Sequence, residues 1–246
     1  MRYLVISDLH GNWEAVQAVL KSASGQHDRV VCLGDLVGYG ANPNEVTDWM
    51  RSSEVISVRG NHDRACAGLE DLEWFNPVAR AAAEWTQSQL TPENLAYIAS
   101  LPKGPMVLDG FQLMHGSLLD EDEYVVGEAD AGQTFPYLEA SIAFFGHTHL
   151  QGGFEWTRNR IRPIRKPSVK QKEMVLELQP DSAYLVNPGS VGQPRDGDPR
   201  AGYVLYHSDE HYLSYCRVPY DVAAAQARIR EAGLPDLLAD RLVFGR

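Results

Sequence analysis

Apolar residues follow two patterns along the chain, and the pattern changes near the middle. In the N-terminal part, short apolar runs alternate with segments whose apolar residues recur every three or four positions, as in residues 12–22. The runs predict buried strands and the spaced segments predict amphipathic helices. We expect strands at 3–7, 30–33 and 55–58, and helices at 12–22, 44–50, 77–89 and 91–100. Strands that alternate with helices indicate βαβ units and a parallel sheet.

Beyond residue 105, short strand patterns dominate. We expect strands at 106–108, 111–115, 142–145, 153–156, 174–178, 184–186, 202–207 and 212–218. A helix at 221–231 follows, and Gly233 and Pro235 mark its end. A run of strands of this kind predicts a second, partly antiparallel sheet that packs on the first.

Length and composition fit one α/β domain. The chain has 246 residues, 44% of them hydrophobic, and α/β folds of up to about 250 residues form single domains. We therefore expect one domain, 1–246. The three cysteines, Cys32, Cys66 and Cys216, are scattered and form no CxxC pair, which predicts reduced thiols. No leader pattern or apolar run of ~18 residues occurs, so we expect a cytoplasmic protein with no membrane span.

The charge distribution bears on the partners. The formal net charge is -11 at pH 7, and an acidic chain repels a nucleic-acid backbone, so a nucleic-acid partner is not expected. Residues 158–172 form a basic stretch with seven arginines and lysines. A solvated hairpin tip is the favoured interpretation of this stretch, and a substrate-binding loop is the alternative.

Five short polar motifs fall at the ends of expected strands. They are Asp8-Leu9-His10, Gly34-Asp35, Gly60-Asn61-His62-Asp63, His115-Gly116 and Gly146-His147-Thr148-His149. The loops after parallel strands open on one edge of a sheet, so these side chains are expected to converge there. Each motif alone has a structural explanation: Asp8 could cap the following helix, and His115 could be a satisfied core histidine. The ordered set of five favours a functional site.

This mixture of side chains suits metal-assisted phosphate-ester hydrolysis. The reaction needs a nucleophile at neutral pH and positive charge beside the phosphoryl oxygens, and two metal ions about 3.5–4 Å apart supply both. Imidazole and carboxylate ligands suit Mn, Fe, Zn, Co or Ni better than Ca or Mg. Residues two apart in an extended segment point to the same side, so Asp8 and His10 can reach one ion.

The five motifs resemble those of the calcineurin-like metallophosphoesterase superfamily, and residues 187–195 resemble the small prokaryotic phosphodiesterase-like branch. The resemblance implies a four-layer α/β/β/α sandwich, with two mixed sheets flanked by helices and a dinuclear site between them. It implies one ion held by Asp8, His10, Asp35 and His149. It implies a second held by Asp35, Asn61, His115 and His147, with Asp35 as the bridge.

The resemblance also assigns residues that do not bind metal. His62 matches the catalytic histidine, which protonates the leaving oxygen or stabilises the transition state, and Asp63 is a candidate to orient it. Asn187 and Ser190 are expected to brace the loop beneath the site.

One departure from the family concerns the substrate. Members that act on phosphoproteins carry an arginine shortly after the bridging aspartate, whereas residues 36–40 contain none. This argues against phosphoprotein and symmetrical dinucleoside tetraphosphate substrates. Arg195 and Arg200 are candidates for phosphate contacts, and a charged surface turn is the equal alternative.

The resulting hypothesis is a phosphoesterase that hydrolyses a small phosphate mono- or diester, with a nucleotide as one candidate. Two divalent ions are the expected cofactors, with Mn favoured. A nuclease is one alternative, which the acidic balance disfavours. A protein scaffold on the same fold is another, and His62 argues against it because the scaffold of this superfamily lacks a histidine there.

Overall fold

Six strands form a mixed sheet, which contains both the first and the last strand of the chain. The computed structural model describes residues 1–246, apart from the side chain of Trp74. Within the described residues the sheet has the order β3-β2-β1-β11-β12-β9. Its strands are β1 (Arg2–Ile6), β2 (Arg29–Cys32), β3 (Ile56–Ser57), β9 (Glu173–Glu177), β11 (Ala201–His207) and β12 (Tyr212–Val218). β1, β2 and β3 are parallel, and β11 runs antiparallel to β1, with Arg2 opposite His207.

A second mixed sheet has the order β4-β5-β6-β10-β7-β8 within the same described residues. Its strands are β4 (Met106–Leu108), β5 (Phe111–Leu113), β6 (Ile142–Phe144), β7 (Gly152–Thr157), β8 (Arg160–Ile164) and β10 (Ser182–Asn187). β6 is parallel to β5 and β10, whereas β7 is antiparallel to β10 and β8. The prediction that the strands after residue 105 form the second sheet is wrong for β9, β11 and β12. These three strands belong to the first sheet, because β11 pairs with β1.

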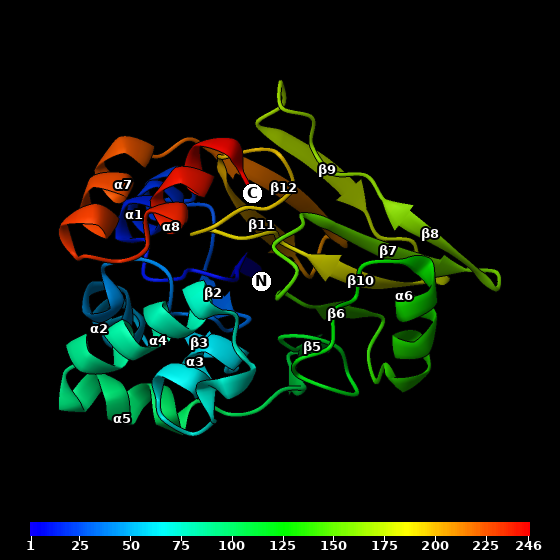
Figure 1. The fold of residues 1–246 in the computed structure, drawn as a ribbon. Helices are drawn as coiled ribbons and strands as arrows, with labels where there is room; N and C mark the ends of the chain where they lie inside the picture. The colour runs from blue at the N-terminus through cyan, green and yellow to red at the C-terminus, as the bar shows by residue number, and fades with distance from the viewer.

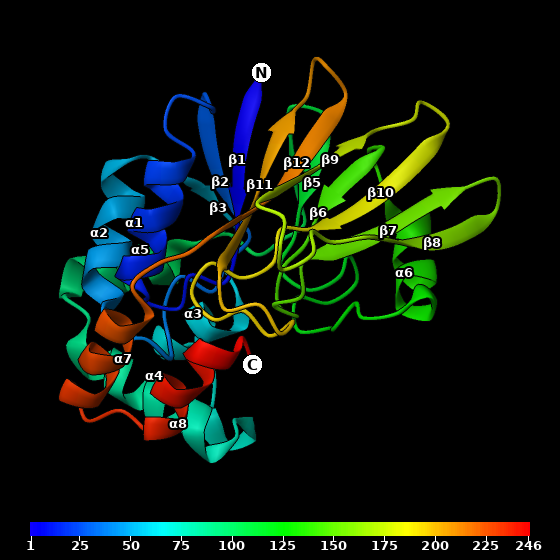
Figure 2. The same cartoon turned by 90° about the horizontal axis from the view of Figure 1, so that it is seen from above.

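The two sheets face each other across a hydrophobic core, and helices cover their outer faces (Figures 1 and 2). Strand alternation assigns residues to the layers: Tyr3 and Val5 of β1 pack between the sheets, while Leu4 and Ile6 pack under the helices. Figure 2 shows most helices outside the first sheet and α6 outside the second. The expected four-layer α/β/β/α fold is confirmed.

Several of the helices begin at a polar capping side chain. They are α1 (Trp13–Ser22), α2 (Pro43–Ser52), α3 (Asn61–Cys66), α4 (Pro77–Gln89), α5 (Pro92–Ser100), α6 (Glu128–Thr134), α7 (Val222–Glu231) and α8 (Asp236–Asp240). Short 3-10 helices are η1 (Leu72–Trp74), η2 (Phe135–Tyr137) and η3 (Arg241–Phe244). The side chains of Asn12, Thr91 and Asp221 cap α1, α5 and α7 by accepting backbone N–H groups. Asn12, and not Asp8, therefore caps α1.

The basic stretch 158–172 includes a strand. Arg160–Ile164 forms β8, which pairs with β7 through a turn at Arg158 and Asn159. The expectation of a solvated hairpin tip thus holds for the turn but misses the strand. The cysteines are buried free thiols in the described chain, as expected. Among the described helices, none is long and apolar enough to cross a bilayer.

Candidate metal centre

The predicted ligands lie in five loops at one edge of the two sheets. Asp8 and His10 follow β1, Asp35 follows β2, and Asn61 begins α3 just after β3. In the second sheet, His115 follows β5, and both histidines of the Gly146–His149 motif follow β6. The carboxyl ends of strands from both sheets therefore supply the side chains.

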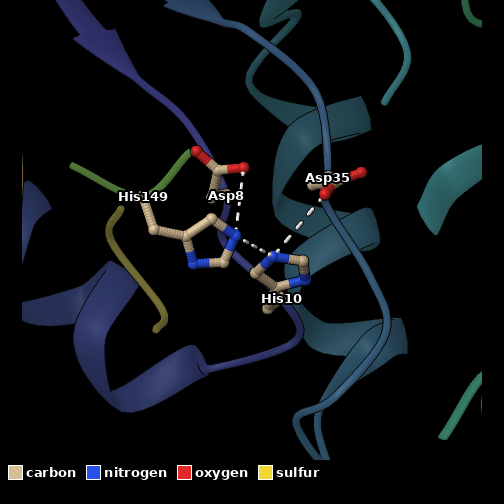
Figure 3. A group of neighbouring side chains, drawn as sticks. All are labelled: Asp8, His10, Asp35 and His149. Atoms are coloured by element: carbon tan, nitrogen blue, oxygen red, sulfur yellow. Dashed lines mark hydrogen bonds and ion pairs between the residues drawn. The ribbon is translucent and has the colours of Figure 1, made fainter. Parts of the chain in front are cut away.

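The first group contains Asp8, His10, Asp35 and His149, which offer ligand atoms all within 4.8 Å of one another (Figure 3). The His149 Nε2 lies 3.5 Å from Asp8 Oδ1, and the His10 Nε2 lies 3.6 Å from Asp35 Oδ2. All four residues are at most 2% exposed. We call them the inner group.

The second group shares Asp35 with the first and adds His115 and His147. The His115 Nε2 lies 3.4 Å from Asp35 Oδ2 and 3.3 Å from the Asn61 side-chain oxygen Oδ1. The rings of His115 and His147 have centroids 4.8 Å apart. We call Asn61, His115 and His147 the outer group; Asp35 joins it to the inner group.

Backbone carbonyls fix which nitrogen of each imidazole faces the centre. The Nδ1 of His10, His115 and His149 lies against the carbonyl of Val37, Leu33 and Gln193, respectively. A carbonyl oxygen only accepts, so Nδ1 carries a proton, and in the neutral ring Nε2 presents its lone pair. His147 is reversed: its Nε2 donates to the Asp122 carbonyl at 3.1 Å, which leaves Nδ1 as its lone-pair atom.

The donor set fits a cation. The Nε2 atoms of His10 and His149 face each other at 3.1 Å, and two lone pairs at that distance repel unless positive charge lies beside them. Asp8 Oδ2 and Asp35 Oδ2 are buried and accept no hydrogen bond from the described residues. Buried carboxylate oxygens of this kind are paired or coordinate metals.

The pKa values describe a site that holds positive charge around Asp35. Burial raises the pKa of Asp35, but opposing contributions, of which that of His115 is the largest, hold this pKa well below its usual range. Burial alone lowers the pKa of His115, yet the Asp35 carboxylate raises it to about 10. Burial lowers the pKa of His147 to about 3 and of His62 to about 4, which favours neutral rings.

Unusual backbone conformations aim the ligands. Asp8, His10, Asp35, His147 and His149 all have positive φ, between 47° and 64°. Such values are uncommon for residues with a Cβ and cluster at functional sites. The glycines of the motifs supply room: a Cβ on Gly60 would lie 2.1 Å from Asp35 Oδ1, and one on Gly146 would lie 2.0 Å from Ser7 Oγ.

His62 lies beside the centre without joining either group. Its backbone N–H donates to Asp35 Oδ1 at 2.9 Å, and its ring packs edge-on against His10 and Phe75 and beside Tyr39. The ring helps to line an open cleft of about 260 Å³. The lining also includes Tyr39, Asn61, Arg64, Glu70, Phe75, Asn76, Ala79, Asp122, Tyr124 and His147.

Asp63 does not orient His62, contrary to expectation. Its carboxylate accepts the backbone N–H groups of Asp35, Leu36, Val37 and Gly60 at 2.8–3.3 Å. It therefore ties the loop after β2 to the start of α3. His62 and Asp63 are neighbours in helix α3, and successive helical side chains point in different directions.

Asn187, the last residue of β10, and Ser190, in the loop that follows, brace the site as expected. The Asn187 amide donates to the Gly146 carbonyl at 2.9 Å, and the Ser190 hydroxyl donates to the Asp8 carbonyl at 2.8 Å. Both contacts fix loops that carry predicted ligands.

The two candidate phosphate arginines have different surroundings. Arg195 donates from its backbone N–H to the His149 carbonyl at 3.3 Å, and its guanidinium lies 5.7 Å from the centroid of the Tyr39 ring. Arg200 is engaged elsewhere, in an ion pair with Asp198 at 2.6 Å and a hydrogen bond to the Gln171 carbonyl at 2.8 Å. The structure brings Arg195 to the site and gives Arg200 a role in the surface turn.

Three residues near the site are not identified by the sequence patterns. Tyr39 and Tyr124 line the cleft, and the Tyr124 ring stacks on that of His147 with centroids 4.0 Å apart. Arg241, from η3, donates to Gln193 Oε1 at 3.2 Å. Tyr39 has one signal in the sequence, its position between two glycines; Tyr124 and Arg241 have none, because only tertiary folding places them here.

Comparison with known proteins agrees with this geometry. Residues 1–211 match the family model of the calcineurin-like phosphoesterase superfamily domain, so the chain belongs to that superfamily. With its clustered histidines and aspartates, it is a metal-dependent phosphoesterase.

Its relatives span the full length of the chain. It is 35% identical over 250 residues to an uncharacterized protein of Methanocaldococcus jannaschii, with 98% of this chain and 97% of that protein covered. A metallophosphoesterase from Sphaerobacter thermophilus matches with a TM-score of 0.87 and 40% identity, covering 100% of this chain and 99% of that one. A hypothetical protein from Pyrococcus horikoshii OT3 shares the fold, with a TM-score of 0.78 at 19% identity and 100% and 98% coverage.

Proposed function

We propose that the chain is a dinuclear-metal hydrolase that cleaves a small phosphate mono- or diester, with a nucleotide as one candidate substrate. The observation that carries the proposal is the sharing of Asp35 by two groups of ligand atoms. The Oδ2 atom of Asp35 lies 3.6 Å from His10 Nε2 of the inner group and 3.4 Å from His115 Nε2 of the outer group. A carboxylate placed between two sets of ligands in this way is suited to bridge two cations. The nitrogen-rich donor set favours Mn²⁺, with Fe, Zn, Co and Ni as alternatives.

In this proposal the inner group holds one ion, and Asp35 with the outer group holds the other. The inner ligands are Asp8, His10, Asp35 and His149, and the outer ligands are Asp35, Asn61, His115 and His147. Bound ions supply a nucleophilic water and neutralise charge on the phosphoryl oxygens. The chain's own part is to fix ligand orientation through the carbonyls that hold each imidazole.

His62 is the proposed catalytic residue. It lines the cleft between Asn61 and Tyr39, where a substrate would approach the outer group. Packing against Phe75 and Tyr39 holds the ring in place. From there it can donate a proton or an N–H hydrogen bond to the leaving oxygen, a contribution of typically 10²–10⁴-fold for a positioned acid.

The cleft supports a small substrate. Its volume of about 260 Å³ is slightly below the range of drug-sized ligand sites, which runs from about 300 to 1,000 Å³. We propose that residues 1–246 act as one domain. The supporting contacts are β1 pairing with β11 and Arg228 of α7 pairing with Glu14 of α1 at 2.6 Å.

A metal-reloading experiment tests the proposal. Protein stripped with a chelator is reloaded with Mn, Fe, Zn, Co or Ni, and bound metal is counted by elemental analysis. We expect two ions per chain and hydrolysis of bis(4-nitrophenyl) phosphate or 4-nitrophenyl phosphate with Mn²⁺. One ion per chain would contradict the bridging role of Asp35. Faster cleavage of phosphoserine peptides would overturn the substrate class, and no cleavage of any ester with any metal would leave a scaffold.

A further inference from the structure

Around the loop of residues 193–200, two arginines beside the metal centre differ from the others because they lack an ion-pair partner among the described residues. Arg200 pairs with Asp198, and Arg217 pairs with Asp196 and with the Gln151 side chain. Their positive charges are neutralised within the fold. Arg195 and Arg241 have no such partner: no carboxylate of a described residue forms an ion pair with either of them.

Instead, Arg195 and Arg241 converge on one neutral atom. Gln193 Oε1 accepts Arg195 Nη2 at 2.9 Å and Arg241 Nη1 at 3.2 Å. The Nε atom of each guanidinium is buried and donates to no acceptor among the described residues. Two cations therefore lie side by side, partly withdrawn from water, in a chain whose net charge is -11.

This arrangement is costly for the protein alone. Burial lowers the pKa of Arg241, and the neighbouring charge of Arg195 lowers it further. Like charges in a partly buried site repel unless an anion lies between them. Two guanidiniums together match the charge of a phosphoryl dianion, which carries about −1.5 to −2 at pH 7, and guanidinium binds phosphoryl oxygens through paired N–H groups.

The arginine pair lies next to the cleft. Gln193 accepts the Nδ1–H of the predicted ligand His149 on its own carbonyl, so the residue links the pair to the inner group. Arg195 stands over Tyr39, which lines the cleft. Tyr124 lines the cleft beside His147. Burial raises the pKa of Tyr124, and the positive charge of Arg195 partly offsets this rise.

The C-terminal segment holds Arg241 in this position. Leu242 of η3 is buried, and the Gly197 N–H donates to the Gly245 carbonyl at 3.0 Å, which fastens the segment to the loop that carries Arg195. Arg241 lies outside residues 1–211, the part matched by the family model. The pair thus combines a residue of the family domain with one that follows it.

We infer that Arg195 and Arg241 form a second anion subsite, which binds a phosphoryl group of the substrate other than the one cleaved at the metal centre. The preferred substrates are then small phosphate esters that carry a second phosphoryl group. This inference rests on the proposed function, because it names the substrate class of the same site.

Two nitrophenyl esters that differ by one phosphoryl group test the inference. They are thymidine 5′-(4-nitrophenyl phosphate) and the same compound with a 3′-phosphate, assayed with the Mn²⁺-loaded protein. We expect a higher kcat/KM for the 3′-phosphorylated ester. Arg195→Met and Arg241→Met should each lower the ratio of the two kcat/KM values by about 10- to 100-fold, the weight of a charge-assisted contact. Arg241→Lys, which keeps the charge but not the paired N–H groups, should lower it less.

A binding measurement gives a readout without turnover. Calorimetric titration with methylenediphosphonate, which has two phosphoryl groups on an uncleavable bridge, should show tighter binding than inorganic phosphate, and Arg241→Met should remove the difference. Arg246→Met, an exposed arginine in the same segment, is the matched control and should change neither measurement.

Three results would overturn the inference. They are equal rates of wild-type protein on the two esters, equal losses on both esters in the arginine variants, and equal binding of phosphate and methylenediphosphonate. If the wild type cleaves neither ester, the proposed function fails, and the calorimetric comparison alone decides whether the subsite exists.

Discussion

The inner and outer groups share Asp35 but differ in their access to solvent. The inner residues are at most 2% exposed, and the Ser190 hydroxyl holds the backbone carbonyl of Asp8, one of them. Asn61 and His147 of the outer group line the open cleft, beside His62 and Tyr124. In the proposed dinuclear centre, the difference means that the buried inner group would retain its ion, whereas the outer group would meet the substrate.

The largest expected effect comes from the residue that the two groups share. Asp35→Asn keeps the shape but removes the charge from both groups, so we expect kcat/KM to fall by about 10⁴-fold or more. Elemental analysis should show that both ions are bound more weakly. Asp181→Asn, at an exposed turn, is the control and should retain both. Loss of a single ion in Asp35→Asn would show that the carboxylate serves one group alone.

His62→Ala should give the next largest effect, and it should act on turnover without removing metal. We expect a loss of about 10²–10⁴-fold in kcat/KM on an ester with a poor leaving group, because such a group needs protonation. The loss should be smaller with nitrophenolate, a good leaving group. The measurement is kcat/KM on both esters with metal content determined in parallel. Wild-type rates on the poor ester would remove His62 from the mechanism.

Paired ligand deletions test the two groups separately. Asn61→Ala removes a proposed ligand, so it should weaken binding of the outer ion by at least the roughly 10- to 100-fold that loss of a contact supporting a ligand costs, and it should leave the inner ion in place. His149→Ala should weaken the inner ion instead. Metal retention after dialysis against graded chelator distinguishes them. If both variants lose both ions in step, the inner and outer groups are not independent.

Asp63→Asn should reduce stability with less effect on the chemistry. The asparagine amide keeps one acceptor oxygen, but its NH2 group would replace the oxygen that accepts the backbone N–H groups of Asp35 and Gly60. These N–H groups would then lose their acceptor. Leaving buried donors unpaired costs about 2–3 kcal/mol of unfolding free energy. Asp221→Asn is the matched control, because asparagine caps a helix as well as aspartate does. Equal denaturation midpoints for the two variants would contradict this role of Asp63.

The smallest expected effect concerns Glu121, which forms ion pairs with Arg59 and with Arg64 of the cleft lining. Burial raises the pKa of Glu121, but Arg59 and Arg64 outweigh it and lower that pKa below its usual value. The contribution of Glu121 to stability is thus present above its unfolded-state pKa and is lost as the pH falls through its lower folded pKa. Glu121→Gln should flatten the acid limb of the stability curve, measured by urea denaturation between about pH 6 and pH 3. An unchanged acid limb would show that the ion pairs contribute nothing there.

Local signals predicted most of the regular elements. Asn76-Pro77 and Thr91-Pro92 are start signals, and α4 and α5 begin at those prolines. The sequence did not reveal α3 and α6, because they are short and carry little apolar periodicity. The pairing of β1 with β11 was also missed, since it joins residues about 200 positions apart and no local pattern encodes it.

The candidate site, like the fold, could be predicted only in part from the sequence. Histidines and aspartates at strand ends are visible as motifs, and the structure brings these motif residues together. The contacts that hold them come from backbone carbonyls, such as that of Leu33 against His115, and a carbonyl carries no sequence signal. Arg241 has no motif and reaches the site through the docking of η3. Arg200 has the right charge, but Asp198, two residues away, neutralises it.

The pairing of β1 with β11 also constrains the order of events during synthesis. β1 is made before the other strands of its sheet, yet the second of its two neighbours, β11, begins only at Ala201. The backbone N–H groups of Val191 and Gly192, which close the loop of Ser7 and Asp8, emerge just as late. Contacts this distant in sequence form slowly. The sheet beside Asp8 therefore stays incomplete until residues 191–207 have been made, and the proposed metal ligands can reach their final positions only after that.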